Sequence, residues 1–272
     1  MTVADIRPTS FSAPPKTDIP RVDVLGVGVS AINLDDAVST IRTWVAGGRR
    51  SYICVTGVHG VMESQDDPAL RDIHNRAGLV TPDGMPLVWL LKHAGHRGAD
   101  RVYGPDLMAA VFADTDTGDG PAHFLYGSTP EVLERLSRNL QARFPGCRIA
   151  GTFSPPFRPL TDAEEAEVAA RINASGAGIV WVGLSTPKQE RWMAAHRPHL
   201  TAPVLVGVGA AFDFHAGLKR QAPRVIQRSG FEWLFRLATE PRRLWRRYAT
   251  NNPRFVVRIA GQLLRRPRPP AA

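Results

Sequence analysis

The sequence predicts an α/β fold, in which a Rossmann-like, mostly parallel sheet carries helices on both faces and is followed by a basic helical appendage. Three observations predict this class. Short apolar runs alternate with helical patterns over residues 21–222, a βαβα order that is typical of a covered parallel sheet. Small and polar residues gather where the apolar runs end, which is where parallel sheets bind ligands. After Pro223, only helical patterns rich in arginine remain.

The predicted strands are apolar runs bounded by turn residues. They fall at 21–32 (one strand or a pair), 51–57, 78–84 (a short strand and turn), 122–128, 147–153, 177–185 and 202–214 (a strand and turn). The predicted helices lie between them, at 34–48, 60–77, 85–95, 104–114, 129–144, 161–175 and 186–200. Acidic residues open the first helix and glycines end it, Pro68 interrupts the second, and 85–95 is apolar enough to be buried. Thr129 with Pro130, and Thr161, are typical helix starts.

Charge divides the chain into a neutral body and a basic end. The net charge is +9, and residues 228–272 carry all of it, with eleven arginines, no lysine and only Glu232 and Glu240 as acids. Three short helices are expected there, at 224–240, 241–252 and 253–266, with Val256, Ile259 and Leu263 on one face of the last. A basic end on a neutral body predicts a separate task for that end.

Three segments follow from these patterns: a disordered leader over 1–20, an α/β catalytic domain over 21–222 and an Arg-rich helical appendage over 223–272. The leader has no apolar core of the kind that signal peptides have, and no apolar run reaches the roughly 18 residues of a membrane span. Cys54 and Cys147 predict buried thiols rather than a disulfide framework or a metal cluster, which fits a reducing cytoplasm.

Two motifs resemble known sites only loosely. "GVGVSA" (26–31) matches a dinucleotide-binding pattern, but its helix does not open at the third position and no suitable acidic residue follows, so a tight turn is the better prediction. "DTDTGD" (114–119) contains an Asp-x-Asp that could hold a metal on a nucleotide diphosphate. Its glycine-rich, polar surroundings favour a solvated loop instead, so no metal and no cofactor are predicted.

"LVTPDGMPLVWLL" (79–91) is a sharper candidate. Asp83 follows a strand and could serve only as a turn residue. A strongly apolar stretch follows at once, however, and a carboxylate at the border of an apolar region can serve as a general base. Arg101 precedes a Gly-Pro-Asp helix start and could hold a phosphate or carboxylate with two hydrogen bonds. Lys188 and Gln189 lie at a strand-to-helix junction that suits a phosphate or a sugar hydroxyl.

Six blocks together resemble the WecG/TagA/CpsF glycosyltransferases, in order and spacing, from about residue 22 to 248. They are "TGVHGVMES", "LVTPDGMPLVW", "RVYGPDLM", "VGLSTPKQERWM", "GVGAAFDFHAG" and "APRVIQRSGFEWLFRLATEPRRLWRRY". The resemblance implies transfer of a sugar from a UDP-sugar, typically UDP-N-acetylmannosamine, to an undecaprenyl-diphosphate-linked saccharide. It also implies inversion, no bound metal, and a peripheral place on the inner face of the plasma membrane.

The resemblance also implies roles for individual residues. Asp83 is expected to be the catalytic base, and Thr56, Arg101 and Gln189 are expected to line the pocket. Lys188 and Asp213 join them as substrate-binding candidates at strand ends. The appendage is expected to close over the site and to dock on an anionic membrane, with candidate contacts to the diphosphate or the membrane from Arg236, Arg243, Arg246 and Arg247.

One departure and three alternatives remain open. Family members often have asparagine two residues after the pocket threonine, where this chain has Val58 beside His59, so the donor could be a plain hexose or a uronic acid. Arginines of the appendage could instead bind nucleic acid, although no recognition-helix motif is present. A scaffold without activity is disfavoured by the presence of Asp83, Arg101 and Gln189. The sequence does not determine whether the chain forms a homo-oligomer.

Overall fold

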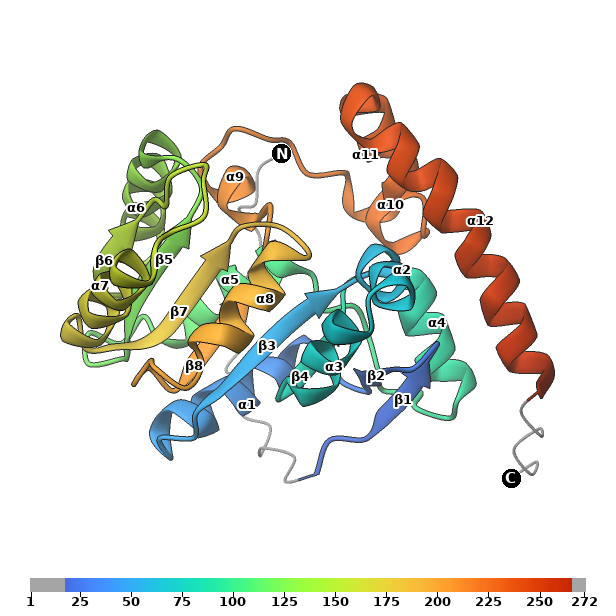
Figure 1. The fold of residues 1–272 in the computed structure, drawn as a ribbon, viewed down its shortest axis with the longest axis horizontal. Coiled ribbons are helices and arrows are strands. Elements are labelled where there is room, and N and C mark those ends of the chain that lie inside the picture. Colours follow the sequence, from blue (N-terminus) through green and yellow to red (C-terminus); the bar gives the residue numbers. More distant parts are fainter. Residues whose placement is uncertain (1–17, 266–272) are drawn as a thin grey trace.

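The computed structural model describes residues 18–265, and within them the main sheet has six strands, all parallel (Figure 1). The strand order is β4-β3-β8-β7-β5-β6. The strands are β3 (Ser51–Thr56), β4 (Leu79–Pro82), β5 (Ala122–Gly127), β6 (Ile149–Phe153), β7 (Ala177–Gly183) and β8 (Val204–Gly207). A separate antiparallel hairpin consists of β1 (Arg21–Val24) and β2 (Val27–Ser30), which confirms the expected strand pair and places the predicted tight turn at Leu25 and Gly26.

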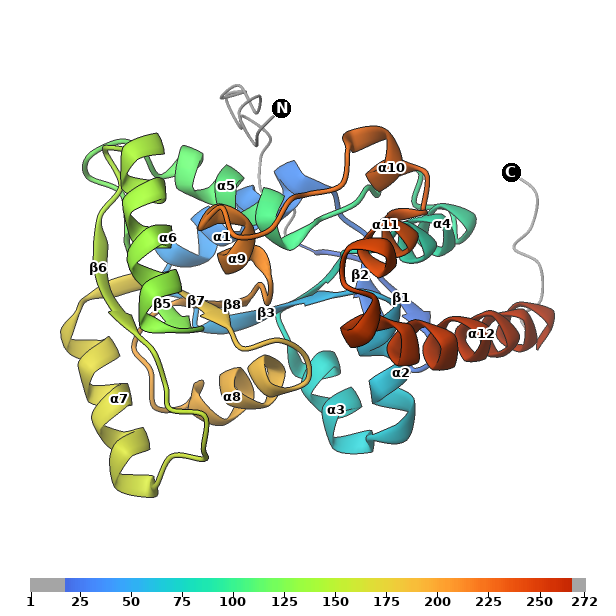
Figure 2. The same cartoon turned by 90° about the horizontal axis from the view of Figure 1, so that it is seen from above.

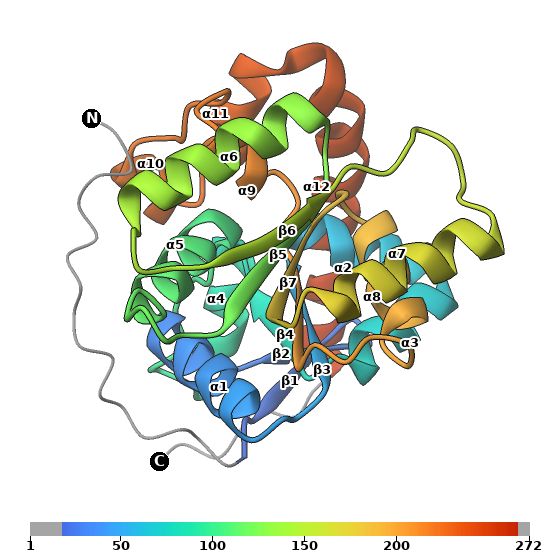
Figure 3. The ribbon, with the colours of Figure 1, turned by 90° about the vertical axis from the view of Figure 1, so that its left-hand side faces the viewer.

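Helices cover both faces of the sheet (Figures 2 and 3). One face carries α1 (Leu34–Ala46), α5 (Gly104–Asp114), α6 (Pro130–Arg143) and α9 (Ala211–His215). The other carries α2 (Val58–Asp66), α3 (Pro68–Arg76), α7 (Asp162–Ala174) and α8 (Lys188–His196). Alternate residues of one strand therefore enter two cores: in β7, Val180 and Val182 join one, whereas Ile179 and Trp181 join the other. The predicted α/β class is confirmed.

Helix α4 (Met85–His93) begins directly after Asp83 and Gly84 at the end of β4. It was expected to be buried, and this is wrong for one of its faces. Leu87 and Leu91 are fully buried, but Trp89 is 52% exposed. Leu87 and Leu91 lie four residues apart and so share a face that packs on the body, while Trp89 lies on the other side and faces a cavity.

The C-terminal appendage consists of α10 (Arg224–Arg228), α11 (Glu232–Thr239) and α12 (Pro241–Arg265). Two expectations about it are wrong. The stretch 224–240 is interrupted at Gly230, whose φ of +81° suits glycine and whose added Cβ would lie 2.6 Å from the ring of Trp89. Residues 241–265 form one helix that continues through Pro253. Proline removes one hydrogen bond there, and its exposed position allows water to satisfy the freed carbonyl.

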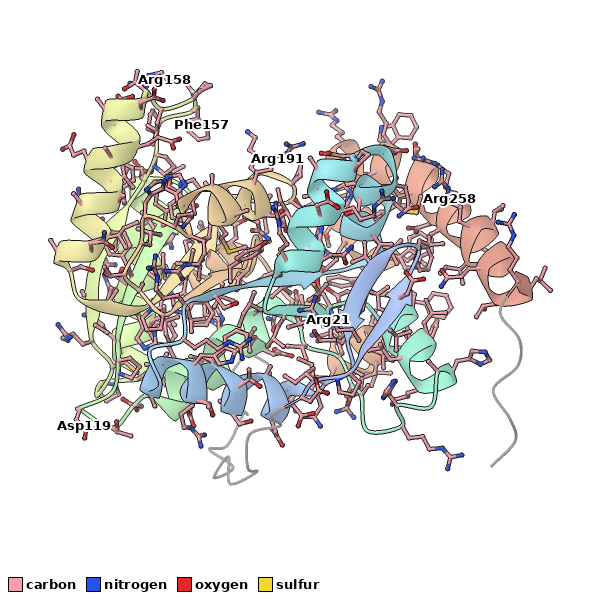
Figure 4. The ribbon with its side chains drawn as sticks, turned by 60° about the horizontal axis from the view of Figure 1, so that its bottom comes forward. Arg21, Asp119, Phe157, Arg158, Arg191 and Arg258 are labelled. Atoms are coloured by element: carbon pink, nitrogen blue, oxygen red, sulfur yellow. The ribbon has the colours of Figure 1, made fainter. Side chains whose placement is uncertain are left out.

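Helix α12 is held against the body along its length. Phe255 is buried in the core beside α2, and Arg254 pairs with Asp66 of α2 at 2.6 Å. The side chain of Gln262 accepts a hydrogen bond from the backbone of Leu25 in the hairpin turn, at 2.8 Å. Arg258, labelled in Figure 4, donates to the side chain of Gln65. The appendage therefore packs on one side of the body, next to α2 and α4 (Figure 1).

The structure also bears on the expected segments. Of the leader predicted over 1–20, residues 1–17 lie outside the described residues, and the boundary at 222–223 stays a prediction. Both cysteines are buried and unpaired, as expected. Between residues 18 and 265, no helix is both long enough and apolar enough to cross a membrane.

Candidate active site

A cavity of about 870 Å³ opens at the carboxyl edge of the sheet. Its walls come from the ends of β3 and β4, the exposed side of α4, Thr186 after β7, and the facing sides of α11 and α12. The size lies in the range of about 300–1,000 Å³ that is usual for small-molecule sites. The appendage therefore forms one wall of the cavity and the sheet forms the other.

Strand pairing places Asp83 in this cavity. Thr56 and Pro82 face each other at the ends of the parallel strands β3 and β4. The backbone N–H of Asp83 then donates to the carbonyl of Thr56 at 3.0 Å, which extends the pairing by one residue. A Cβ added at Gly57, directly after Thr56, would contact the Oδ2 of Asp83 at 3.9 Å, so the glycine leaves this side of the carboxylate uncovered. The Asp83 side chain is 28% exposed, so its carboxylate is partly accessible from the cavity.

The segment between α4 and α5 brings Arg101 next to Asp83. The backbone N–H of Val102 donates to the carbonyl of Pro82 at 2.9 Å, and this places Arg101 beside Asp83. The Nε of Arg101 donates to the backbone carbonyl of Asp83, and its Nη2 lies 3.5 Å from the Asp83 carboxylate. The guanidinium also lies 4.1 Å from the ring centre of Tyr103. Arg101 is therefore held by contacts on several sides.

The appendage supplies an acid to this arginine. The Nη2 of Arg101 lies 2.5 Å from the Oε2 of Glu232, and both side chains are only 13% exposed. Burial opposes the charge on Arg101, but the carboxylates of Asp83 and Glu232 outweigh it and raise the pKa of Arg101. Burial raises the pKa of Glu232, and Asp83 adds to this effect against the attraction of Arg101. The ion pair therefore links the appendage to the sheet next to Asp83.

Two more arginines line the cavity, Arg236 and Arg247. Burial opposes the charge on Arg236, but the field of Tyr103, Tyr248 and the two carboxylates, Glu232 and Asp83, keeps its pKa raised. Together with Arg101, they give the cavity three guanidinium groups, and Asp83 and Glu232 give it two carboxylates, counted over residues 18–265. An excess of positive charge beside one partly exposed carboxylate suits a polyanionic ligand.

The cavity wall on α2 contains Val58 and His59. His59 shares a hydrogen bond of 3.1 Å with the side chain of Asn251 on α12. Burial and the nearby Arg247 lower the pKa of His59 to about 3, so its ring is neutral at physiological pH. The side chain that departs from the family pattern, Val58, therefore faces the same cavity as Asp83.

The other predicted residues lie elsewhere. Thr56 is buried behind the cavity wall, and Gln189 is buried with its Nε2 donating to Glu190. Lys188 is exposed at the start of α8, and Asp213 pairs with Lys219 at 2.8 Å. Other predicted contacts come from the appendage. Arg246 is exposed over the ring of Trp245, and the side chain of Arg243 lies outside what the structure describes.

Gln189 is nevertheless close to the site. It follows the loop that contains Thr186, which lines the cavity. Among the described residues its buried Oε1 has no hydrogen-bond partner, and it lies next to Gly209 at the end of β8. A buried amide oxygen without a partner is costly unless a ligand or water satisfies it.

Several cavity residues were not predicted as site residues. For Glu232, the sequence gives one signal: it is one of only two acids in the basic end, and an isolated acid among arginines suggests a specific ion pair. Gln227 and Tyr248 lie within the sixth block of the resemblance but had no role assigned there, and Asn251 lies beyond it. All three reach the cavity through the packing of the appendage.

The Asp-x-Asp of residues 114–119 lies away from this cavity. Asp114 ends α5, and the chain then enters the amino end of β5, opposite the edge that carries Asp83. Figure 4 shows Asp119 at the far side of the molecule from α12. Asp114 is paired with Arg42, and Asp116 accepts a hydrogen bond from the backbone of Gly146. Across residues 18–265, no cluster of three histidine, cysteine or acidic side chains could hold a metal.

Comparison with known proteins agrees with the resemblance. A family model described as "Glycosyl transferase WecG/TagA/CpsF family" matches residues 22–269. Similar curated proteins include the N-acetylglucosaminyldiphosphoundecaprenol N-acetyl-beta-D-mannosaminyltransferases of Staphylococcus aureus strains NCTC 8325 / PS 47 and COL. Each is 26% identical over 247 residues, which cover 90% of this chain and 94% of the relative. The similarity therefore spans the body and the appendage together.

Proposed function

The chain belongs to the WecG/TagA/CpsF family of glycosyltransferases, and on this premise we propose that it transfers a sugar from a UDP-sugar to a hydroxyl of a polyprenyl-diphosphate-linked saccharide. The reaction serves the synthesis of a bacterial cell-surface polysaccharide. The single observation that carries the proposal is the cavity in which the Asp83 carboxylate lies among Arg101, Arg236 and Arg247. A base beside clustered cations matches the needs of a reaction that deprotonates a hydroxyl and releases a diphosphate.

Asp83 acts as the general base. Its carboxylate takes the proton of the acceptor hydroxyl while that oxygen attacks the anomeric carbon from the face opposite UDP. The new carbon–oxygen bond forms as the bond to the diphosphate breaks, and UDP leaves with the electron pair. One base is enough because inversion is a single displacement. The contacts of the Asp83 backbone with Thr56 and Arg101 support this role, since they hold residue 83 in the wall of the cavity.

Arginines stabilise the leaving diphosphate. Arg101 and Arg236 line the cavity within the field of Asp83 and Glu232, and guanidinium groups bind phosphate oxygens with two hydrogen bonds each. Arg243 and Arg246 are further candidates for the diphosphate or for the membrane surface. The carboxylates of the Asp-x-Asp are engaged by Arg42 and Gly146 at the other edge of the sheet, which supports a transfer that needs no metal at that motif.

The donor lies along the carboxyl edge of the sheet. Thr56 is the last residue of β3, and Lys188, Gln189 and Asp213 follow β7 and β8, so all four lie at this edge, which is where parallel sheets bind nucleotides. The chain leaves β5 towards β6 and leaves β7 towards β8, which lie on opposite sides of this pair of strands. The two connections therefore separate at the carboxyl edge, and such a switch point is where open parallel sheets bind ligands. The partnerless Oε1 of Gln189 supports a contact to the donor.

The donor sugar is N-acetylmannosamine or a related sugar. The Staphylococcus aureus relatives are named as N-acetylmannosaminyltransferases that act on an N-acetylglucosaminyl-diphosphoundecaprenol. Val58 stands in the cavity where the family pattern often has an amide, and this favours a hexose or a uronic acid as the second candidate. The valine side chain cannot hydrogen-bond the acetamido group that distinguishes N-acetylmannosamine from a plain hexose.

The appendage faces a membrane that carries the acceptor. Its arginines attract anionic headgroups, with about 1 kcal/mol for each arginine near the surface. Trp245, Val257 and Leu264 are exposed on α12 and could enter the interface. This supports a peripheral place on the inner face of the plasma membrane.

A UDP-release assay tests the proposal. Purified protein is given a panel of UDP-sugars and a short-chain polyprenyl-diphosphate-N-acetylglucosamine acceptor, with and without EDTA. We expect release with one donor, dependent on the acceptor and unchanged by EDTA. Loss of release on adding EDTA would contradict the metal-independent transfer. Release without any acceptor product would show hydrolysis rather than transfer.

A further inference from the structure

The cavity continues as an apolar groove beyond the arginines. On α4 its wall includes Trp89 and Leu90, and on α12 it includes Val256, Ile259 and Leu263. Trp89 is 52% and Val256 is 65% exposed, so these side chains border open space rather than fill a core. Large apolar side chains that line a shared open groove are typical of a binding surface.

The groove follows one face of α12 for several turns. The lining residues run from Tyr248 through Asn251, Phe255 and Ile259 to Leu263, spaced by three or four residues. With a rise of 1.5 Å per residue, this face is about 22 Å long. Their polarity changes along it, because tyrosine and asparagine lie at the end near Asp83 and only apolar side chains follow.

We propose that this groove binds the first isoprene units of the polyprenyl chain of the acceptor. The inference rests on the proposed function, and it adds the position of the lipid chain, between α4 and α12. The acceptor has its sugar, diphosphate and hydrocarbon chain in linear order. The cavity offers the Asp83 carboxylate, then Arg247 on α12 for the diphosphate of the acceptor, then the apolar face of α12, in the same order.

The apolar residues that line the groove differ from those of α12 that could only contact a bilayer. Val257 and Leu264 are 72% and 87% exposed on α12, yet neither lines the cavity. Their neighbours Val256 and Leu263 do. The helix therefore offers two adjacent pairs of apolar residues, of which one faces the groove and the other faces away from it.

These pairs make a matched experiment. The Val256→Asn/Leu263→Asn variant changes the groove, and the Val257→Asn/Leu264→Asn variant makes the same changes outside it. Calorimetric titration in solution compares farnesyl diphosphate with dimethylallyl diphosphate, which has the same headgroup and a shorter chain. We expect the wild type to bind the farnesyl compound about tenfold or more tightly, because the longer chain buries more methylene groups. The groove variant should lose most of this preference, and the other variant should keep it.

Equal affinity of the wild type for both compounds would overturn the inference, and so would equal losses in the two variants. Turnover separates this outcome from failure of the proposed function. The same proteins are assayed with N-acetylglucosaminyl-diphosphate esters of farnesol and of ethanol. Transfer to both esters without a chain preference would refute the groove and leave the transferase standing. Chain binding without any transfer would refute the proposed function and leave the groove as a lipid site.

Discussion

Replacing Asp83 by asparagine is expected to lower kcat by about 10²- to 10⁴-fold, the usual contribution of a general base. The amide has nearly the same size but cannot take the proton of the acceptor. The fold should not change, because the contacts that place residue 83 use its backbone: its N–H donates to Thr56, and its carbonyl accepts from Arg101. Initial rates of transfer, thermal unfolding and UDP affinity are measured together.

The matched control is Asp72→Asn, which neutralises an exposed carboxylate on α3 outside the cavity. It should leave kcat, the melting temperature and UDP affinity unchanged. Near-wild-type turnover by Asp83→Asn would remove Asp83 from the role of base. A loss of UDP binding as large as the loss of kcat would mean that Asp83 binds the donor rather than activating the acceptor.

Removal of residues 228–272 is expected to abolish transfer and binding to anionic vesicles together. The deletion removes Glu232, Arg236, Arg247 and the whole of α12 from the cavity, and it also removes eleven arginines. Asp83 would then face bulk water, without the cations proposed for the diphosphate. At about 1 kcal/mol for each arginine near an anionic surface, the loss of vesicle binding should be large. Co-sedimentation with phosphatidylserine vesicles and the transfer assay measure the two effects.

Two further variants separate the roles of the appendage. Deletion of residues 266–272 removes two arginines beyond the described helix and should leave transfer to a short-chain acceptor unchanged. The Arg236→Ala/Arg247→Ala variant keeps the helix and should lose transfer while it retains most vesicle binding. Full transfer activity after deletion of 228–272 would contradict a catalytic part for the appendage.

Local patterns were sufficient for most of the body. Thr129 and Thr161 cap α6 and α7 with their side chains, as their positions before amphipathic stretches predicted. The end of β4 placed Asp83 at the carboxyl edge, because the apolar run and the Pro-Asp-Gly turn fix where that strand stops. Each of these features depends on neighbours in the sequence, so a single sequence contains them.

Features that depend on distant partners could not be predicted. The pair of Arg101 and Glu232 joins residues 131 positions apart, and nothing near either residue indicates the other. Pro253 looked like a helix start, yet α12 runs through it because contacts of Arg254, Phe255 and Gln262 hold the helix on the body. Tertiary packing there outweighs the local preference of proline.

Only part of the site could be predicted from the sequence. Asp83 and Arg101 were placed by motif and resemblance, and the structure puts both beside the cavity. The sequence shows that the stretch after Asp83 is apolar, but not which of its residues face the core. In the structure, α4 buries Leu87 and exposes Trp89 to the cavity. Gln189, Lys188 and Asp213 lie at the predicted edge of the sheet but outside this cavity, and their contacts to a donor stay predictions.

The anomeric configuration of the product tests the central claim most directly. The wild-type protein is incubated with the α-anomer of UDP-N-acetylmannosamine and the farnesyl-diphosphate-linked N-acetylglucosamine acceptor, and the one-bond carbon–proton coupling at the new anomeric carbon is measured by NMR. A single displacement with Asp83 as the base predicts a β-linked product. An α-linked product would contradict the account, because retention requires a second step that one base cannot supply.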